Sequence, residues 1–191
     1  MKKEQKSTYC EHCGDFHDAP PGEFASSVRV GEPIPDFEFE AFHKGAAKTM
    51  KLSDLRGKWL IIPFYPADFG ALSARELADL AGVYPQLKKL GAEVLAMSTD
   101  TILAHDAWRK AESLLAAVTF PMGSDPSGKI SYAFGTLIED EGAALTDEEG
   151  LSLRATFIVD PHGILRSQEI LDTIAPRSAA ETLRKLEALI K

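Results

Sequence analysis

The stretch from Lys58 to Leu77, K-W-L-I-I-P-F-Y-P-A-D-F-G-A-L-S-A-R-E-L, decides the fold of this 191-residue chain. Its first part is a continuous apolar run bounded by Gly57 and Pro66, which is typical of a strand buried on both faces of a sheet. From Ser73 to Leu90, apolar residues recur at spacings of three and four, as in a helix with one buried face. The stretch therefore predicts a buried strand that leads into an amphipathic helix.

The segments that follow predict parallel strands. Gly91 is suited to end the helix in a left-handed conformation, and Ala92 to Ser98 has the composition of a second strand. Asp100 or Thr101 can cap a further helix that runs to about Leu115. A strand, a helix and a second strand in this order predict a right-handed crossover within a parallel part of the sheet.

The second half predicts a hairpin and a terminal helix. Arg154 to Asp160 and Ile164 to Ile170 are predicted strands, and Pro161-His162-Gly163 between them is too short for a crossover, so the strands should be antiparallel neighbours. A last helix follows Arg177, with Ser178 to Glu181 (S-A-A-E) as a predicted capping box. We therefore expect the α/β class and a thioredoxin-like fold, with a mixed central sheet flanked by helices.

The N-terminal segment sets the domain organisation. Residues 1–23 are polar and contain the chain-breaking Ala19-Pro20-Pro21-Gly22, so we expect a tail over 1–23 and a single domain over 24–191. The stretch from Ile138 to Gly150, rich in Asp, Glu, Gly and Ala, predicts a loop.

Charge and hydropathy exclude two classes of partner. The chain has 21 Lys and Arg against 29 Asp and Glu, a formal charge of −8, and no basic run beyond its first residues, so we do not expect it to bind nucleic acid. No apolar run approaches the ~18 residues of a membrane span, and the start lacks the apolar segment of a signal peptide. We expect a cytoplasmic protein without a membrane partner.

Ser73 stands where the strand gives way to the helix. Ser73-Ala74-Arg75-Glu76 fits a capping box, in which the serine hydroxyl accepts from the Glu76 N–H and contributes about 0.5–2 kcal/mol. A structural role is therefore favoured over a catalytic one. A serine nucleophile needs a base, for which His105 and His162 are candidates, but histidines in helices and turns are usually solvent-facing. The stretch A-L-S-A-R also lacks the G-x-S-x-G pattern of serine hydrolases.

Four blocks in order resemble the peroxiredoxins, specifically the alkyl hydroperoxide reductase C type. They are F-Y-P-A-D-F before the helix, S-T-D-T with a downstream A-W, F-P-M-G-S-D-P, and R-A-T-F-I-V-D-P-H-G-I-L-R. The resemblance extends from about Val30 to Leu189. It implies the thioredoxin-like fold, thiol-dependent reduction of hydroperoxides without a cofactor in the domain, a homodimer or a ring of dimers, and a thiol reductant as partner.

The resemblance also places a catalytic pocket at the strand-to-helix turn. In that family the turn has the pattern F-Y-P-x-D-F-T-x-x-C-P-x-E, and its cysteine is the peroxidatic nucleophile. The cysteine falls on Ser73, the threonine on Gly70 and the second proline on Ala74. The resemblance thus implies a family pocket without its thiol.

The scaffold residues of that pocket are retained. The family's first proline, its glutamate and its arginine fall on Pro66, Glu76 and Arg154. A cysteine at a helix N-terminus near an arginine has its pKa lowered to roughly 3.5–7.5, attacks peroxide as a thiolate and becomes a sulfenic acid, which serine cannot do. Without a thiolate, we expect Arg154 to form an ion pair with Glu76 or Glu169, in preference to holding a small anion at the helix N-terminus.

The only two cysteines, Cys10 and Cys13, lie in the tail, within Y-C-E-H-C-G-D-F-H. A C-x-x-C pair can be a dithiol redox centre or part of a zinc site. With His17 as a third ligand and His12 or Asp15 as a fourth, zinc fits better than redox chemistry, because no strand precedes the pair to place it at a helix N-terminus. A local disulfide or free thiols are the alternative.

Two functions therefore stay open. In the first, the protein no longer reduces peroxides at the family site and acts as a binding, oligomeric or regulatory module, with zinc on its tail. In the second, it is a thiol oxidoreductase in which Cys10 and Cys13 perform the chemistry and the pocket at Ser73 only binds substrate.

Overall fold

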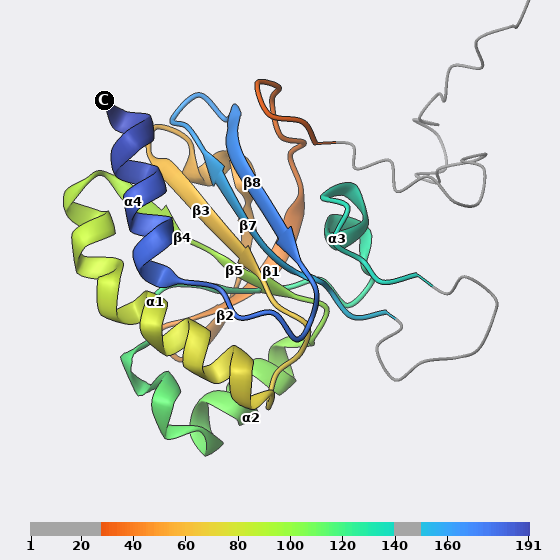
Figure 1. Cartoon of the computed structure of the whole chain (residues 1–191). Helices are drawn as coiled ribbons and strands as arrows, with labels where there is room; N and C mark the ends of the chain where they lie inside the picture. Colours follow the sequence, from red (N-terminus) through yellow and green to blue (C-terminus); the bar gives the residue numbers. More distant parts are fainter. Residues whose placement is uncertain (1–27, 140–149) are drawn as a thin grey trace, which may run out of the picture.

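The computed structural model describes residues 28–139 and 150–191, which form one sheet with helices on both faces (Figure 1). The strands are β1 (Glu38–His43), β2 (Ala46–Lys51), β3 (Trp59–Phe64), β4 (Ala92–Val94), β5 (Ala96–Ser98), β6 (Met122–Ser124), β7 (Arg154–Val159) and β8 (Leu165–Leu171). The helices are α1 (Ala71–Lys89), α2 (Ile102–Ala111), α3 (Lys129–Ala133) and α4 (Ala179–Ile190), with the 3-10 turns η1 (Leu52–Leu55) and η2 (Ser113–Ala117).

The sheet is mixed, as the sequence predicts. Its order is β2-β1-β6-β5-β3-β7-β8, and β4 also pairs with β3. Strand β3 is parallel to β4 and β5 and antiparallel to β7, so α1 is the crossover between parallel strands. Helices α1 and α4 pack against each other on one face (Figure 1). The predicted mixed sheet flanked by helices is confirmed.

Strand β3 is buried on both faces, and this divides the core in two. Ile61 packs with Leu77 of α1 and Leu186 of α4 on one side. Ile62 and Phe64 face the other side, where the residues around α3 cover them. The continuous apolar run predicted this arrangement, because neighbouring residues of a strand point to opposite faces.

The predicted hairpin between β7 and β8 is also confirmed. The two strands are antiparallel, and their connection is closed by Asp160, whose Oδ1 accepts from the N–H groups of His162 at 2.8 Å and Ile164 at 3.0 Å. Gly163 has φ = 84°, a left-handed conformation that glycine adopts without steric cost.

Two predicted segments are each divided. The strand over 92–98 is interrupted at Leu95. The part before it, β4, pairs with β3, whereas the part after it, β5, pairs with both β3 and β6. The helix after Thr101 stops at Ala111, since Glu112 is extended and its carboxylate accepts from Leu114 N–H at 3.0 Å to start η2. The Thr101 cap itself is confirmed, with Oγ1 accepting from Ala104 N–H at 3.3 Å.

The capping box of α4 is half confirmed. Ser178 Oγ accepts from Glu181 N–H at 3.3 Å, but the Glu181 carboxylate binds Arg184 instead of returning to the serine N–H. A salt bridge one turn along the helix competes successfully for that carboxylate.

Other predictions fall partly or wholly on undescribed residues. Residues 140–149 of the predicted loop lie outside the described ones, while its ends meet through Ile138 N–H to Leu151 O at 2.8 Å. The predicted boundary between residues 23 and 24 also lies outside them. No helix within 28–139 and 150–191 has the length and apolar character needed to cross a membrane.

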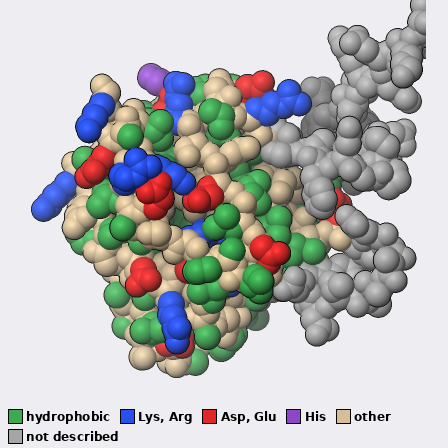
Figure 2. Space-filling model, in the orientation of Figure 1, with side chains coloured by type: hydrophobic (Ala, Val, Ile, Leu, Met, Phe, Trp, Pro, Cys, Tyr) green, Lys and Arg blue, Asp and Glu red, His purple; other side chains and the backbone are tan. Residues whose placement is uncertain are grey.

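Figure 2 shows the protein as a space-filling model in the orientation of Figure 1. Among the coloured, described residues, Lys and Arg side chains lie interspersed with Asp and Glu, and apolar side chains separate them. A basic stripe of the kind that tracks a phosphate backbone is not visible on this face. The expectation that nucleic acid is not a partner stays a prediction.

Three phenylalanines in the core provide a test of the fold. The rings of Phe64, Phe134 and Phe157 have centroids 4.9–5.5 Å apart and are fully buried. Replacing Phe157 by Ala should lower the free energy of unfolding by about 3–5 kcal/mol, measured by urea denaturation. Val30→Ala is the control, because Val30 is 56% exposed and its truncation should cost less than about 0.5 kcal/mol. Equal losses for the two variants would contradict the described core.

Candidate functional site

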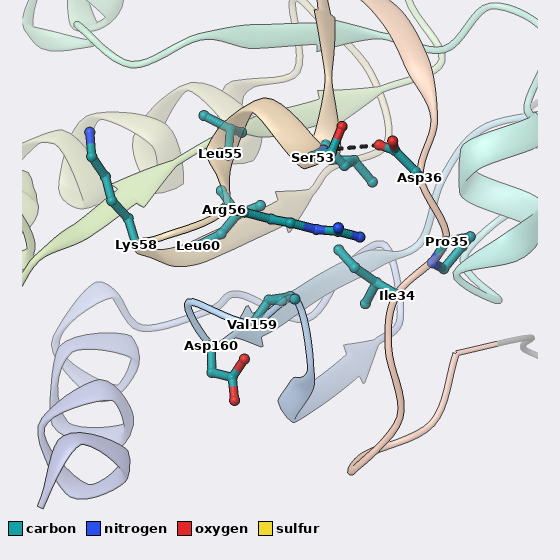
Figure 3. Close-up of a pocket in the computed structure, with 12 residues that line it drawn as sticks. Ile34, Pro35, Asp36, Ser53, Leu55, Arg56, Lys58, Leu60, Val159 and Asp160 are labelled. Atoms are coloured by element: carbon teal, nitrogen blue, oxygen red, sulfur yellow. Dashed lines mark hydrogen bonds between the residues drawn. The ribbon is translucent and has the colours of Figure 1, made fainter.

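A small cavity opens where residues 34–36 pass η1 and the ends of β3 and β7 (Figure 3). Arg56 extends across it, and Asp36 Oδ1 accepts from the Ser53 N–H at 2.9 Å. Its free volume of about 10 Å³ suits a single water molecule. The polar groups here stabilise a turn and do not form a reactive cluster.

The predicted capping box at Ser73 is wrong. Helix α1 begins at Ala71, with Gly70 as its N-cap, so Ser73 is already the third residue of the helix. The reason is that the Gly70 carbonyl accepts from the Ala74 N–H at 2.9 Å and closes the first turn three residues before the predicted start. Ser73 is 1% exposed, and its hydroxyl points into the protein instead of along the helix end.

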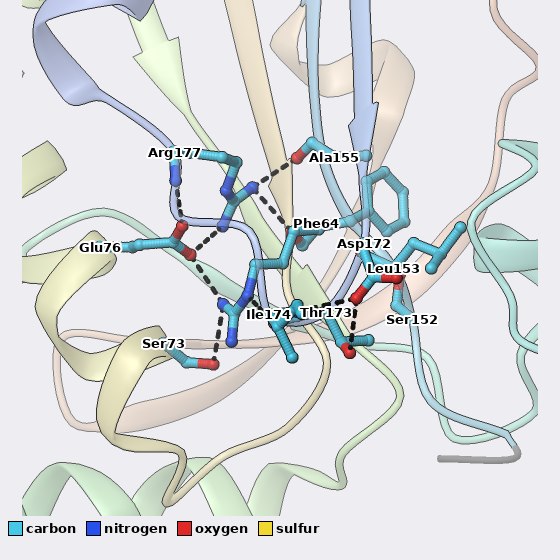
Figure 4. A network of polar contacts seen from close by, with 11 residues as sticks. Phe64, Ser73, Glu76, Ser152, Leu153, Ala155, Asp172, Thr173, Ile174 and Arg177 are labelled. Carbon is cyan, nitrogen blue, oxygen red and sulfur yellow. Dashed lines mark hydrogen bonds and ion pairs between the residues drawn. The ribbon is translucent and has the colours of Figure 1, made fainter.

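Ser73 meets a buried ion cluster (Figure 4). Glu76 Oε2 accepts from Arg154 Nη1 and from Arg177 Nη2, each at 2.8 Å, and Glu76 Oε1 accepts from the Arg177 N–H at 2.6 Å. Ser73 Oγ accepts from Arg154 Nη1 at 3.3 Å. The predicted ion pair of Arg154 is confirmed with Glu76, whereas Glu169 binds Lys185.

Arg177 is the member of the cluster that the sequence did not predict. Its Nη1 donates to the carbonyls of Phe64 and Ala155, at the ends of β3 and β7, while Arg154 Nε donates to the Thr173 carbonyl. The cluster therefore links α1, two central strands and the segment before α4. No local pattern around Arg177 marks it, since its carboxylate partner lies 101 residues earlier.

The environment sets the charge state of the cluster. Burial alone would raise the pKa of Glu76, but the hydrogen bonds and charge of Arg177, followed by the charge of Arg154, hold it below its usual value. Burial lowers the pKa of Arg154, and Glu76 opposes this effect. One carboxylate thus stays ionised between two guanidinium groups.

No base activates Ser73 in the described part of the chain. Among the residues of 28–139 and 150–191, the only polar side chain that contacts its hydroxyl is Arg154, which is a donor. His162 is exposed in its turn, as expected, but the expectation that His105 faces solvent is wrong, since His105 is fully buried. A serine hydrolase mechanism therefore gains no support.

His105 is buried because it pairs with Asp68. Its Nδ1 lies 2.7 Å from Asp68 Oδ2, and its Nε2 lies 3.2 Å from the Gly123 carbonyl oxygen. Both ring nitrogens thus lie within hydrogen-bond distance of an oxygen, one of a carboxylate and one of a backbone carbonyl. Burial raises the pKa of Asp68, and the hydrogen bond and charge of His105 oppose this rise.

Further hydrogen bonds make Asp68 the anchor of the turn before α1. The Tyr65 hydroxyl donates to Asp68 Oδ1 at 2.9 Å, and the Asp68 N–H donates to Asp100 Oδ2 at 2.8 Å. The next residue, Phe69, has φ = 61°, which is unusual and costly for a bulky side chain. Asp68 therefore holds a strained turn beside the ion cluster.

The predicted ligands of the tail, Cys10, Cys13, His12 and His17, lie outside the described residues, as does Asp15. Within the described ranges, no three His, Cys, Asp or Glu side chains lie close enough together to hold a metal ion. The zinc site and the redox centre therefore stay predictions.

Comparison with known proteins gives the family. Residues 30–168 match the sequence model of the AhpC/TSA family. The chain belongs to this family. The selenocysteine-containing peroxiredoxin PrxU of Peptoclostridium acidaminophilum is 37% identical to this chain over 164 residues, which cover 84% of this chain and 77% of PrxU. Alkyl hydroperoxide reductase C of Escherichia coli K12 is 37% identical to this chain over 159 residues, which cover 83% of this chain and 81% of that protein.

The fold of this chain also agrees with that of a solved AhpC structure. The crystal structure of Enterococcus faecalis AhpC superposes with a TM-score of 0.78 at 37% identity, over 85% of this chain and 92% of that one. The expected thioredoxin-like fold of the peroxiredoxin type is confirmed. Thiol-dependent peroxide reduction is the activity of the family.

The Asp68–His105 pair predicts a pH-dependent stability. His105→Leu removes one partner of a buried pair and should lower the free energy of unfolding by about 3 kcal/mol at pH 7. The loss should shrink toward pH 5, because burial raises the pKa of the Asp68 carboxyl and the variant lacks the hydrogen bond and charge of His105 that oppose this rise. Asp68 therefore takes up its proton at a higher pH in the folded variant than in the wild type, and the variant gains more stability as the pH falls. Urea denaturation at the two pH values measures both effects.

The control for this variant is His162→Leu at the exposed turn. It should change the free energy of unfolding by less than about 0.5 kcal/mol at either pH. A loss for His105→Leu that is small or grows as the pH falls would show that the buried Asp68 carboxyl does not depend on His105.

Proposed function

We propose that this protein is a peroxiredoxin-family module that has lost peroxidase chemistry at the family site and keeps the pocket for binding or regulation. The observation that carries the proposal is the environment of Ser73. It occupies the third position of α1, is buried, and contacts Arg154, where the family pattern has its peroxidatic cysteine.

The chemistry of serine supports the loss. A thiolate attacks one oxygen of a peroxide and the O–O bond breaks, so sulfur keeps that oxygen as a sulfenic acid. The other oxygen leaves as hydroxide or alkoxide and takes up a proton to become water or an alcohol. The Ser73 hydroxyl has no base among the described residues and no comparable oxidised state. A hydroxyl that only accepts from Arg154 can bind a ligand but cannot reduce a peroxide.

Two neighbouring positions support the same proposal. Gly70 has no hydroxyl to order a peroxide where the family has threonine. At Ala74, where the family has proline, the N–H donates to the Gly70 carbonyl, a bond that proline cannot make. Three positions thus depart together from the family pattern while Pro66, Glu76 and Arg154 remain.

We also propose a homodimer or a ring of dimers in the cytoplasm, with no nucleic acid or membrane partner. Two large apolar side chains near α2, Phe69 and Leu103, are 60% and 80% exposed, which supports a protein interface there. Sedimentation velocity of the full chain tests the oligomeric state.

Peroxide consumption tests the proposed loss of activity. With a thiol reductant, the wild-type protein should not accelerate hydrogen peroxide loss. Gly70→Thr with Ser73→Cys and Ala74→Pro should restore turnover, and Ser73→Cys alone should be on the order of 100-fold slower, because the positioning groups are missing.

The matched control keeps the serine and changes only its neighbours, Gly70→Thr with Ala74→Pro, and should stay inactive. Wild-type turnover that survives replacement of both tail cysteines would refute the proposal, since no other thiol exists in the chain.

The alternative function uses the tail. Cys10 and Cys13 are the only thiols, so a thiol oxidoreductase would depend on them, with a thiol reductant as partner. We nevertheless propose zinc for the tail, held by Cys10, Cys13 and His17, with His12 or Asp15 as fourth ligand. Metal analysis of the purified chain should find about one zinc per protein, and Cys10→Ser with Cys13→Ser should abolish it. Wild-type peroxide turnover that this double variant lacks would favour the alternative instead.

A further inference from the structure

Strand β2 leaves one edge of the sheet open. It stands at the end of the strand order, and among the residues of 28–139 and 150–191 it pairs with β1 alone. All of its residues except Met50 are exposed. Strands β1, β6 and β5 lie between it and β3, at whose end the ion cluster is formed. What this edge binds is therefore independent of the chemistry at Ser73.

The turn of the β1–β2 hairpin determines which backbone groups point outward. Lys44 and Gly45 have φ of 53° and 81°, as in a type I′ turn, so the residues on either side of them form the first hydrogen-bonded pair. Hydrogen-bonded and non-hydrogen-bonded pairs alternate along an antiparallel ladder. Ala47 and Thr49 thus occupy non-hydrogen-bonded positions, and their N–H and C=O groups point away from β1, toward the open edge.

This edge is regular and accessible. The register of β1 with β2 continues without a shift over the whole length of β2, and β2 contains no proline. The side chains of Ala47 and Thr49 are small, so they leave the outward backbone groups within reach of another strand. Bulges, prolines and charged side chains, lysine above all, are the usual protection of an open edge. Here lysine is the form of protection that the edge has.

The lysines give the edge a positive potential. Lys51 Nζ lies 3.4 Å from Glu38 Oε2, but no carboxylate of a described residue pairs with Lys44 or Lys48. Their charges reach the neighbouring imidazole, since burial, followed by the charges of Lys44 and Lys48, holds the pKa of His43 below its usual value. The edge is therefore locally basic, although the whole chain has a formal charge of −8.

The alternation of β2 defines what a complementary strand must look like. Lys48 shares a face of the sheet with Ala41, its partner on β1, while Ala47 and Thr49 lie on the other face. A strand added to this edge places every second side chain beside Lys48 and the remaining ones beside Ala47 and Thr49. Opposite charges on neighbouring strands are stabilising, so the complementary strand has an acidic residue at every second position.

We propose that β2 binds an acidic, extended segment of a partner protein by strand addition, with main-chain hydrogen bonds to Ala47 and Thr49 and carboxylates beside Lys44 and Lys48. The backbone bonds supply affinity that any strand can use, and the lysines select an acidic one. A second copy of β2 is disfavoured as the occupant, because pairing two such edges brings their lysines together.

A labelled peptide tests the proposal on the full chain by fluorescence anisotropy. The wild-type protein should bind E-V-E-V-E-V-E saturably at low ionic strength, and salt should weaken the binding because the lysines are exposed. The neutral peptide Q-V-Q-V-Q-V-Q should bind about tenfold more weakly. The acidic peptide with N-methylated valines keeps its charge but cannot donate to the carbonyls of Ala47 and Thr49, so it should also bind about tenfold more weakly.

Charge reversal separates this edge from general attraction between charges. Lys44→Glu with Lys48→Glu should abolish binding of the acidic peptide and create binding of K-V-K-V-K-V-K. The matched control is Lys89→Glu with Lys191→Glu, which changes the net charge equally at two exposed lysines on other elements. It should weaken binding of the acidic peptide less than about twofold.

Amide hydrogen exchange locates the contact. The N–H groups of Ala47 and Thr49 should exchange freely in the full chain and become protected when the acidic peptide is added. Thr49→Pro removes one outward N–H without removing a bond to β1, and should weaken binding about tenfold. If this variant does not fold, the N-methylated peptide tests the same hydrogen bonds from the other side.

Three results would overturn the proposal. The first is the absence of saturable binding of the acidic peptide to the wild-type protein. The second is equal binding by the charge-reversed variant and its matched control, or by the N-methylated peptide, since the attraction would then not involve this edge. The third is protection of Ala47 and Thr49 without any peptide, which would show that another copy of the chain already covers β2.

Discussion

The position of one carboxylate organises this end of the molecule. Glu76 lies between two arginines and, through them, joins α1 to the ends of β3 and β7 and to the segment before α4. These bonds are internal to the protein and do not need a nucleophile at position 73. Under the proposed function, the pocket therefore keeps its shape without a thiol, because the residues that build it are stabilised by each other.

A second buried network supports the other side of the same turn. Asp68 binds His105, Tyr65 and, through its N–H, Asp100, and so fixes the chain immediately before α1. The positive φ of Phe69 shows that the turn is strained. Strain persists only where the surroundings over-determine the conformation, and the two networks on either side of the turn meet this condition.

Local patterns in the sequence predicted the elements that depend on local physics. The apolar run of β3 and the periodicity of α1 were sufficient, as were the hydroxyl caps at Thr101 and Ser178. The β1–β2 hairpin was not predicted, because β2 is mostly exposed and lacks an apolar alternation. Long-range pairs were also beyond local patterns: His105 is buried by a partner 37 residues away, and Arg177 by one 101 residues away. At Ser73 the S-x-x-E pattern was present, but Gly70 is the N-cap of α1, because its carbonyl accepts from the Ala74 N–H.

The hydrogen bond from the Ala74 N–H to the Gly70 carbonyl bears on evolutionary reversibility. A chain cannot have this bond and also a proline at position 74, so the first turn of α1 is committed to one arrangement or the other. Under the proposed function, a single reverse substitution at Ser73 would place a thiol in a turn whose backbone is closed and whose neighbour has no hydroxyl. Recovery of the full rate would need coordinated changes, because the first substitution at Ser73 alone would restore only on the order of a hundredth of the turnover.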